Sequence, residues 1–262
     1  MPLTTQPPIP GYEPVRLLGI NLGTVYLARH SDSGTLVALK VFHRRVAAHV
    51  GDLYAPLARL DHPNIIRVLG FGDFEEYSYC ALEYVKNTLA DHLLQGSLPA
   101  VDVARLTQAV ASAVQYAADQ GMILSTLTPT EILLSEENIP KLADLHIRHA
   151  SGKSATITPP SAFMAPEEVQ GNATPATDVY RVGAVMYTML TGEPPFPNDG
   201  GMEATLRRVI GERPKSPRQM NPKVSRDLEA VCMRCLEKRP EARYASLHEL
   251  ADKLKLFLES SY

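Results

Sequence analysis

The chain has 262 residues, and its 26 basic and 29 acidic residues give a formal net charge of -3. This length suits one large unit or two lobes. Because the charges nearly balance, the composition gives no reason to expect a nucleic-acid or membrane partner. Three cysteines, and no apolar stretch of about 18 to 20 residues, favour a cytoplasmic protein over a secreted or membrane-spanning one.

The N-terminal third of the chain predicts a short tail followed by a small β-rich lobe. Prolines at positions 2, 7, 8 and 10 disfavour helix and sheet, so residues 1–10 are expected to form a disordered tail. Residues 11–85 are expected to form the lobe. Its predicted strands are 24–28, 36–41, 65–69 and 77–85, with a helix around 46–60.

Residues 86–262 predict a larger and mainly helical lobe. Segment 101–120 carries apolar residues at helical spacing and stops before Gly121, a residue type that commonly ends helices. Segment 178–190 is nearly all apolar, which predicts a buried helix, and 225–238 and 246–258 predict amphipathic helices. The two lobes together indicate an α+β fold.

The segment Cys232-Met233-Arg234-Cys235 has the spacing of thiol-redox and zinc motifs. A structural zinc site usually needs a second pair, and only Cys80 remains in the chain. Cysteines three residues apart in an amphipathic helix commonly pack as small apolar side chains, and we predict that role here.

Seven short strings follow the order and approximate spacing of the protein kinase signatures. They are Leu18-Gly19 with Gly23-Thr24-Val25-Tyr26, Val37-Ala38-Leu39-Lys40, His62-Pro63-Asn64-Ile65, Lys141-Leu142-Ala143-Asp144, Ala165-Pro166-Glu167, Asp178-Val179-Tyr180 and Arg239-Pro240 through Arg243-Tyr244. The chain therefore resembles the eukaryotic-type protein kinases, and segment 221–240 resembles their bacterial Hanks-type Ser/Thr members. The resemblance implies one kinase domain with a two-lobed fold, residues 11–85 forming the N-lobe and 86–262 the C-lobe.

The resemblance also implies which positions would contact a nucleotide. They are Gly19, Val25, Ala38, Lys40, Glu83, Val85, Leu133 and Asp144. The glycine loop lacks the middle glycine of the family pattern, which favours an ordinary hairpin turn there. Lys40 matches the lysine that pairs with the α- and β-phosphates, but Leu53 stands where the family has the glutamate that holds this lysine. A surface lysine at a strand end is the alternative for Lys40.

The segment aligned with the catalytic loop of the family has lost its charges. Thr126 stands at the position of the aspartate base, Thr128 replaces a lysine, and Glu131 replaces a metal-binding asparagine. Asp144 matches the metal-binding aspartate, although His146 replaces the following glycine. Asp144 and Glu131 would offer oxygen ligands to a divalent cation, but these changes together weigh against a magnesium site.

Three further residues match positions with a structural role. Glu167 and Arg243 correspond to a buried ion pair of the C-lobe, and Asp178 to an aspartate that bonds the backbone of the catalytic loop from the start of a buried helix.

From these losses we predict a pseudokinase, inactive or nearly so, that acts on protein partners as a scaffold or conformational switch and retains at most weak ATP binding. The losses are those at Leu53, Thr126, Thr128, Glu131 and His146. One alternative is an active but atypical serine/threonine kinase in which Glu131 serves as base or metal ligand. The other is a protein-interaction module that binds no nucleotide. Neither a nucleic-acid nor a membrane partner is expected for any of them.

Overall fold

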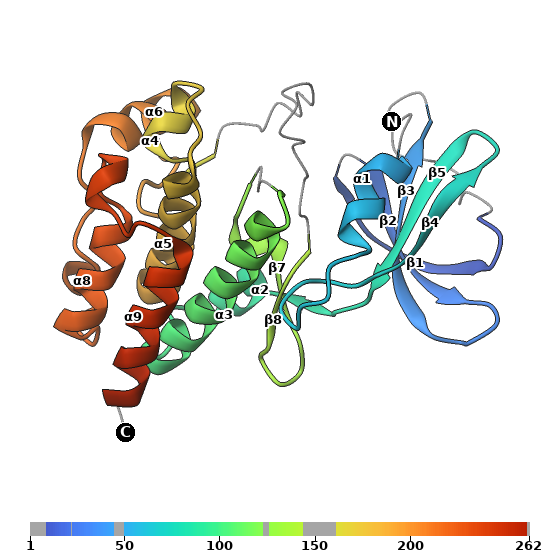
Figure 1. Ribbon diagram of the computed structural model, residues 1–262, viewed down its shortest axis with the longest axis horizontal. Coiled ribbons are helices and arrows are strands. Elements are labelled where there is room, and N and C mark those ends of the chain that lie inside the picture. Colours follow the sequence, from blue (N-terminus) through green and yellow to red (C-terminus); the bar gives the residue numbers. More distant parts are fainter. Residues whose placement is uncertain (1–8, 22, 45–49, 123–125, 144–160, 261–262) are drawn as a thin grey trace. The chain divides into compact units, whose positions relative to one another are not determined.

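The computed structural model describes residues 9–21, 23–44, 50–122, 126–143 and 161–260. The chain divides into two compact units, Met1–Lys86 and Asn87–Tyr262 (Figure 1). The boundary between the lobes was expected one residue earlier, between positions 85 and 86. No helix among the described residues is both long enough and apolar enough to cross a membrane.

The first unit is built on a five-stranded antiparallel sheet with the strand order β1-β2-β3-β5-β4 (Figure 1). The helix α1, Val50–Leu57, packs against β4 and β5. Alternate residues of β3, Val37, Leu39 and Val41, point into the core of this unit. The strands are β1 Tyr12–Asn21, β2 Gly23–His30, β3 Leu36–His43, β4 Val68–Phe74 and β5 Tyr77–Glu83.

Several expectations for this unit are corrected by the structure. Strand β1 was not predicted, and β4 begins at Val68 and not at residue 65. The helix expected over 46–60 ends at Leu57, and residues 45–49 lie outside the described residues. Ile9 was assigned to the tail, but it is 2% exposed and packs in the core cluster. An apolar side chain between prolines can join a core without forming regular structure, which composition alone does not reveal.

The second unit contains a small three-stranded sheet with the order β6-β7-β8 and is otherwise helical (Figure 1). The strands are β6 Asn87–Thr88, β7 Ile132–Leu134 and β8 Pro140–Leu142. The α-helices are α2 Leu89–Leu93, α3 Ala100–Asp119, α4 Pro166–Val169, α5 Pro175–Thr191, α6 Met202–Gly211, α7 Pro217–Met220, α8 Arg226–Cys235 and α9 Leu247–Ser260. Two 3-10 turns are η1 Pro129–Glu131 and η2 Pro240–Ala242.

The four helices expected from the sequence are confirmed as α3, α5, α8 and α9. Helix α3 is followed by Gly121 with φ +77°, the left-handed conformation that glycine adopts without strain. Helix α5 packs against α3 and α8, and α3 packs along α9 (Figure 1). Because helices approach α5 from several sides, nearly all of its residues are buried, as the apolar segment predicted.

The packing role predicted for the cysteine motif is confirmed. Cys232 and Cys235 are fully buried free thiols of α8, and Cys80 is equally buried in β5. Burial raises the pKa of the Cys235 thiol to about 12, although the charges of Arg234 and Arg243 act in the opposite direction. The thiol therefore stays protonated at neutral pH and behaves as a small apolar side chain.

Gly183 of α5 lies against Cys235 of α8 so closely that a Cβ atom at position 183 would stand 2.3 Å from the Cys235 Cβ. We therefore expect Gly183→Ala to lower the free energy of unfolding by about 1–3 kcal/mol, the usual cost of overpacking a core. Urea denaturation measures this change. Gly211→Ala is the control: a Cβ at position 211 meets nothing within 4 Å, so this change is expected not to destabilise. Wild-type stability of Gly183→Ala would contradict the close packing of α5 on α8.

Candidate functional site

Strands β2, β3 and β5 place small apolar residues and a lysine on one face of the first sheet. Val25 lies opposite Lys40, and Ala38 lies opposite Leu82. Directly opposite residues share a face, and so do residues two apart in a strand, so Val25, Ala38, Lys40 and Leu82 line the same side. This side is opposite the core-facing residues of β3. Val25 and Ala38 are half-buried, so part of their apolar surface remains accessible.

Lys40 lies within β3 with only 5% of its surface exposed, so the alternative of a surface lysine at a strand end is wrong. Its ammonium nitrogen is 5.6 Å from the centre of the Phe42 ring. It also faces Cys80 across the sheet, and burial raises the pKa of the Cys80 thiol although the Lys40 charge acts in the opposite direction. Lys40 is therefore a buried cation of the sheet.

The two glycines of the β1–β2 hairpin have different surroundings. A Cβ at Gly23 would stand 2.7 Å from the Val41 carbonyl oxygen, so glycine is required there for the close approach of β2 to the end of β3. A Cβ at Gly19 would meet nothing within 4 Å. Strands β1 and β2 pair as an antiparallel hairpin up to Asn21 and Gly23, and Leu22 lies outside the described residues, so the ordinary turn in place of a phosphate contact stays a prediction.

Glu83 and Val85 lie at the end of the first unit, where backbone contacts with adenine are predicted. Glu83 is the last residue of β5, and its backbone N–H donates to the Arg67 carbonyl at 2.9 Å. Its carboxylate Oε2 accepts from the Arg67 backbone N–H at 3.3 Å. Val85 is half-buried. Their contact with a nucleotide stays a prediction.

In the second unit, Thr126 and Glu131 lie in direct contact. The Thr126 hydroxyl donates to Glu131 Oε1 at 2.6 Å, and the Thr128 backbone N–H donates to Glu131 Oε2 at 2.8 Å. The Glu131 carbonyl accepts from the Ala143 N–H at 2.9 Å, which ties η1 to the end of β8. Leu133 follows in β7 as the half-buried residue of that strand. The structure therefore joins two positions that the sequence treated as separate losses.

Asp144 and His146 lie outside the described residues, as do Leu124 and Ser125. In the part of the chain that is described, no group of three histidine, cysteine, aspartate or glutamate side chains is arranged to hold a metal ion. The predicted metal pair of Asp144 and Glu131 therefore stays a prediction, as does the nucleotide contact of Asp144.

Glu167 and Arg243 form a bidentate ion pair in the second unit. The Arg243 Nη1 and Nη2 atoms donate to the two Glu167 carboxylate oxygens at 2.7 and 2.8 Å, and Arg243 is 2% exposed. Burial raises the pKa of Glu167, but the hydrogen bonds from Arg243 and Thr177 outweigh it, so the pKa is lowered overall. Glu167 therefore remains charged within the protein interior.

Asp178 belongs to a second buried charge cluster that the sequence argument missed. Arg181 of α5 is 2% exposed; its Nη1 donates to Asp178 Oδ1 at 2.9 Å and its Nε donates to Glu168 Oε2 at 3.1 Å. An arginine within an otherwise apolar segment signals such partners, because a buried charge requires them. The bond predicted between Asp178 and the catalytic-loop backbone concerns a loop whose residues 123–125 are not among those described.

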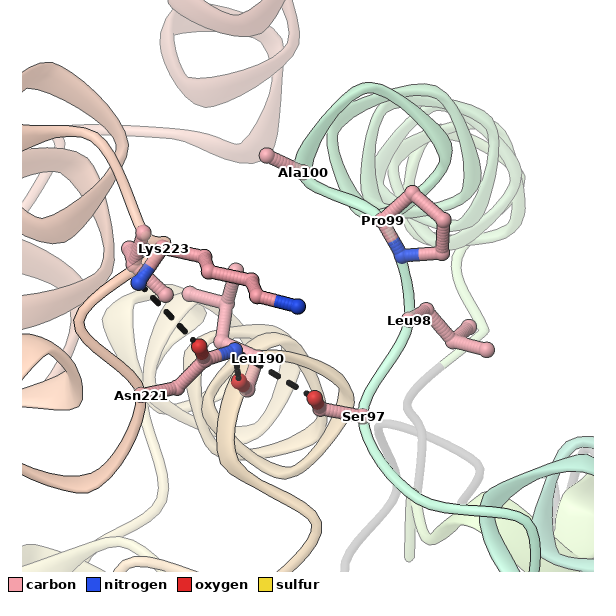
Figure 2. Close-up of a pocket in the computed structure, with 8 residues that line it drawn as sticks. Ser97, Leu98, Pro99, Ala100, Leu190, Asn221 and Lys223 are labelled. Carbon is pink, nitrogen blue, oxygen red and sulfur yellow. Dashed lines mark hydrogen bonds between the residues drawn. The ribbon is translucent and has the colours of Figure 1, made fainter.

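The second unit also has a pocket of about 340 Å³ at the start of α3, which sequence reasoning did not identify. Figure 2 shows the Lys223 side chain extending across the pocket, with Asn221 hydrogen-bonded to its neighbours beneath it. The Asn221 amide donates to the Leu190 carbonyl at 2.9 Å and to the Ser97 hydroxyl at 3.3 Å. None of the residues lining this pocket is one of the predicted site residues.

Comparison with known proteins gives a family for the chain. The family model described as "Protein kinase domain" matches residues 12–254. The serine/threonine-protein kinase PknB of Mycobacterium leprae is 31% identical, with 97% of this chain and 44% of the relative aligned. Pkn1 of Myxococcus xanthus, also named a serine/threonine-protein kinase, is 31% identical over 93% of this chain and 38% of its own length. The chain thus spans less than half the length of these curated relatives.

These relatives contradict our prediction of a pseudokinase that acts as a scaffold, because proteins named serine/threonine-protein kinases align with nearly the whole chain. Residue types compared position by position do not reveal that Glu131 brings a carboxylate to the Thr126 hydroxyl, at the position of the family's base. The predicted α+β kinase fold, with a β-rich N-lobe and a helical C-lobe, is confirmed. The chain belongs to the protein kinase family.

Proposed function

We propose that this chain is the catalytic domain of an atypical serine/threonine protein kinase, which transfers the γ-phosphoryl group of ATP to a hydroxyl group of a protein. The observation that carries the proposal is the alignment of 97% and 93% of the chain with two proteins named serine/threonine-protein kinases. The partner expected from the sequence is then a protein substrate. The buried free thiols are compatible with the reducing cytoplasm that we propose as its location.

The face of the first sheet supports ATP as the phosphoryl donor. Val25 and Ala38 present small, partly accessible apolar side chains, which suit a flat adenine ring. Lys40 lies on the same face and offers the positive charge that phosphate oxygens require. A bulky side chain at position 38 would remove the space for the ring. The residues present therefore fit a nucleotide.

Magnesium would be held by Asp144, by its position in the family pattern, together with phosphate oxygens. When bound, the ion neutralises charge on those oxygens. Both carboxylate oxygens of Glu131 already accept hydrogen bonds, from Thr126 and from Thr128.

The proposal is tested with radiolabelled ATP, Mg²⁺ and casein as a general protein substrate. We expect transfer of label by the wild-type chain, and a decrease of about 10²–10³-fold in Lys40→Met, the usual effect of removing a group that stabilises transferred charge. Lys223→Met is the matched control, because Lys223 is an exposed lysine beside the pocket of Figure 2. Its rate is expected to equal that of the wild type.

A thermal unfolding titration with MgATP gives an independent measurement. A ligand that binds only the folded state stabilises it by about 2.7 kcal/mol at 100 times its Kd. Wild type and Lys223→Met are expected to show the same rise in Tm, and Lys40→Met a smaller one. Transfer no greater in the wild type than in Lys40→Met would contradict the proposed function.

A further inference from the structure

The contact between Thr126 and Glu131 fixes a carboxylate at the position of the missing base. The oxygen–oxygen distance of 2.6 Å is that of a short, direct hydrogen bond from the Thr126 hydroxyl to the carboxylate. The second carboxylate oxygen is held by the Thr128 N–H, and the Glu131 carbonyl by the Ala143 N–H. Three bonds from three different residues therefore fix the side chain and backbone of Glu131.

The chemistry of the two groups is complementary. A threonine hydroxyl alone has no useful basicity near neutral pH, whereas a carboxylate group can accept a proton. A base acts on a substrate proton directly or through one bridging water within hydrogen-bond reach, and a hydroxyl group can take the place of that water. The Thr126 hydroxyl, half-buried and bonded to Glu131, has the properties of such a bridge.

We propose that Thr126 and Glu131 act together as the general base of the phosphoryl transfer, an inference that rests on the proposed function. The substrate hydroxyl gives its proton to Thr126 Oγ1 as Thr126 passes its own proton to Glu131 Oε1. The substrate oxygen forms its bond to the γ-phosphorus of ATP, and the bond from that phosphorus to the β–γ bridging oxygen breaks, releasing ADP. Thr126 ends as a neutral hydroxyl, and Glu131 as a carboxylic acid that later loses its proton to solvent.

Capping of η1 alone does not account for this arrangement. The cap requires only the bond from the Thr128 N–H to Glu131 Oε2, and Oε1 receives the Thr126 hydroxyl in addition. The family pattern has aspartate at position 126 and asparagine at 131, so this chain has exchanged a carboxylate at the first position for one at the second. An asparagine side chain could not accept the proton, and Glu131 can.

The test measures kcat for casein phosphorylation in five variants. Thr126→Val and Glu131→Gln are each expected to lower kcat by about 10²–10⁴-fold, the usual effect of removing a general base. Because the two groups act as one unit, the double variant should be no slower than the slower single one. Thr126→Ser keeps the hydroxyl and should stay within a few-fold of wild type. Thr130→Val removes an exposed hydroxyl of the same turn and should have no effect.

The pH profile separates a proton acceptor from a purely structural residue. The pH dependence of kcat in the wild type should differ in shape from that in Glu131→Gln, because the amide of glutamine cannot accept the proton. Tm values close to wild type show that the variants are folded. If Thr126→Val does not fold, Thr126→Ser and Glu131→Gln still test the roles of the hydroxyl and of the carboxylate. Wild-type kcat in Thr126→Val or Glu131→Gln would overturn the inference.

Two further outcomes are informative. Full recovery of Glu131→Gln by raised Mg²⁺ would indicate a metal ligand and would also overturn the inference. A wild-type chain that transfers no phosphate would overturn the proposed function and this inference together. An active wild type with an equally active Thr126→Val variant would overturn this inference alone.

Discussion

Arg243→Leu is expected to lower the free energy of unfolding by about 3–5 kcal/mol, because it leaves the Glu167 carboxylate, whose side chain is 11% exposed, without its fully buried cation. The loss is large because Arg243 also donates to three backbone carbonyls: its Nη1 to Ala176 at 2.8 Å, its Nε to Glu237 at 2.7 Å and its Nη2 to Lys238 at 3.0 Å. These carbonyls would lose a charged donor as well. Urea denaturation followed by circular dichroism, which reports the helical unit, measures the change.

Arg239→Leu is the matched control for this prediction. Arg239 pairs with Glu241 at 3.7 Å, but both side chains are more than two-thirds exposed. Exposed pairs contribute about 0–1 kcal/mol, so the control should change stability by no more than that. Equal losses in the two variants would show that the Arg243 pair is not buried.

The pH dependence gives a second check on the same ion pair. The pKa of Glu167 is lowered in the folded wild type, so its contribution to stability is present above the pKa of the unfolded chain and is lost as pH falls through the folded value. In Arg243→Leu the buried carboxylate lacks a cation, so its pKa should be raised above that of the unfolded chain. The difference in stability between the two proteins should therefore be smaller near pH 4 than at pH 7.

The sequence predicted the helical unit well because its signals are local. Segment 101–120 repeats its apolar residues at the period of a helix, and a glycine follows, so α3 was predicted to within a residue or two. Strand β1 was missed because bulges at Pro14–Arg16 and Leu17–Gly19 disrupt the alternation of a regular strand. Its pairing with β2 is a contact between segments, which a local pattern does not encode.

The candidate site shows the same limit more strongly. Residue types at positions 126 and 131 were each compared with a family pattern, and each was counted as a loss. Only the fold of η1 brings the Thr126 hydroxyl to 2.6 Å from the Glu131 carboxylate. Two residues that each differ from the family pattern thereby form one hydrogen-bonded pair. The side-chain type alone carries no information about this distance. For Lys40 the sequence predicted a strand over 36–41 but left a surface position open, and the structure shows the residue 5% exposed within β3.

Arg181→Met is expected to lower the free energy of unfolding by about 3–5 kcal/mol, although methionine is more apolar and the site is inside a buried helix. The reason is that the carboxylates of Glu168 and Asp178 would lose their cation away from water. The side chains of Arg181 and Glu168 are 3% and 5% exposed, and that of Asp178 is 13% exposed. Urea denaturation again measures the change. Arg207→Met, which removes an exposed pair with Glu203 in α6, is the control and should change stability by about 0.5 kcal/mol or less.

A double variant tests whether the unpaired Glu168 carboxylate causes the loss of stability in Arg181→Met. Glu168→Gln keeps an oxygen that can accept from the Ala165 N–H, a bond that Glu168 makes at 2.9 Å at the start of α4. Arg181→Met with Glu168→Gln should therefore be more stable than Arg181→Met alone, because one buried charge has been removed while the cap is kept. If the double variant lost stability beyond Arg181→Met, packing of the arginine stem, and not its charge, would account for the effect. Such a result would assign Arg181 to the apolar core that the sequence of α5 first suggested.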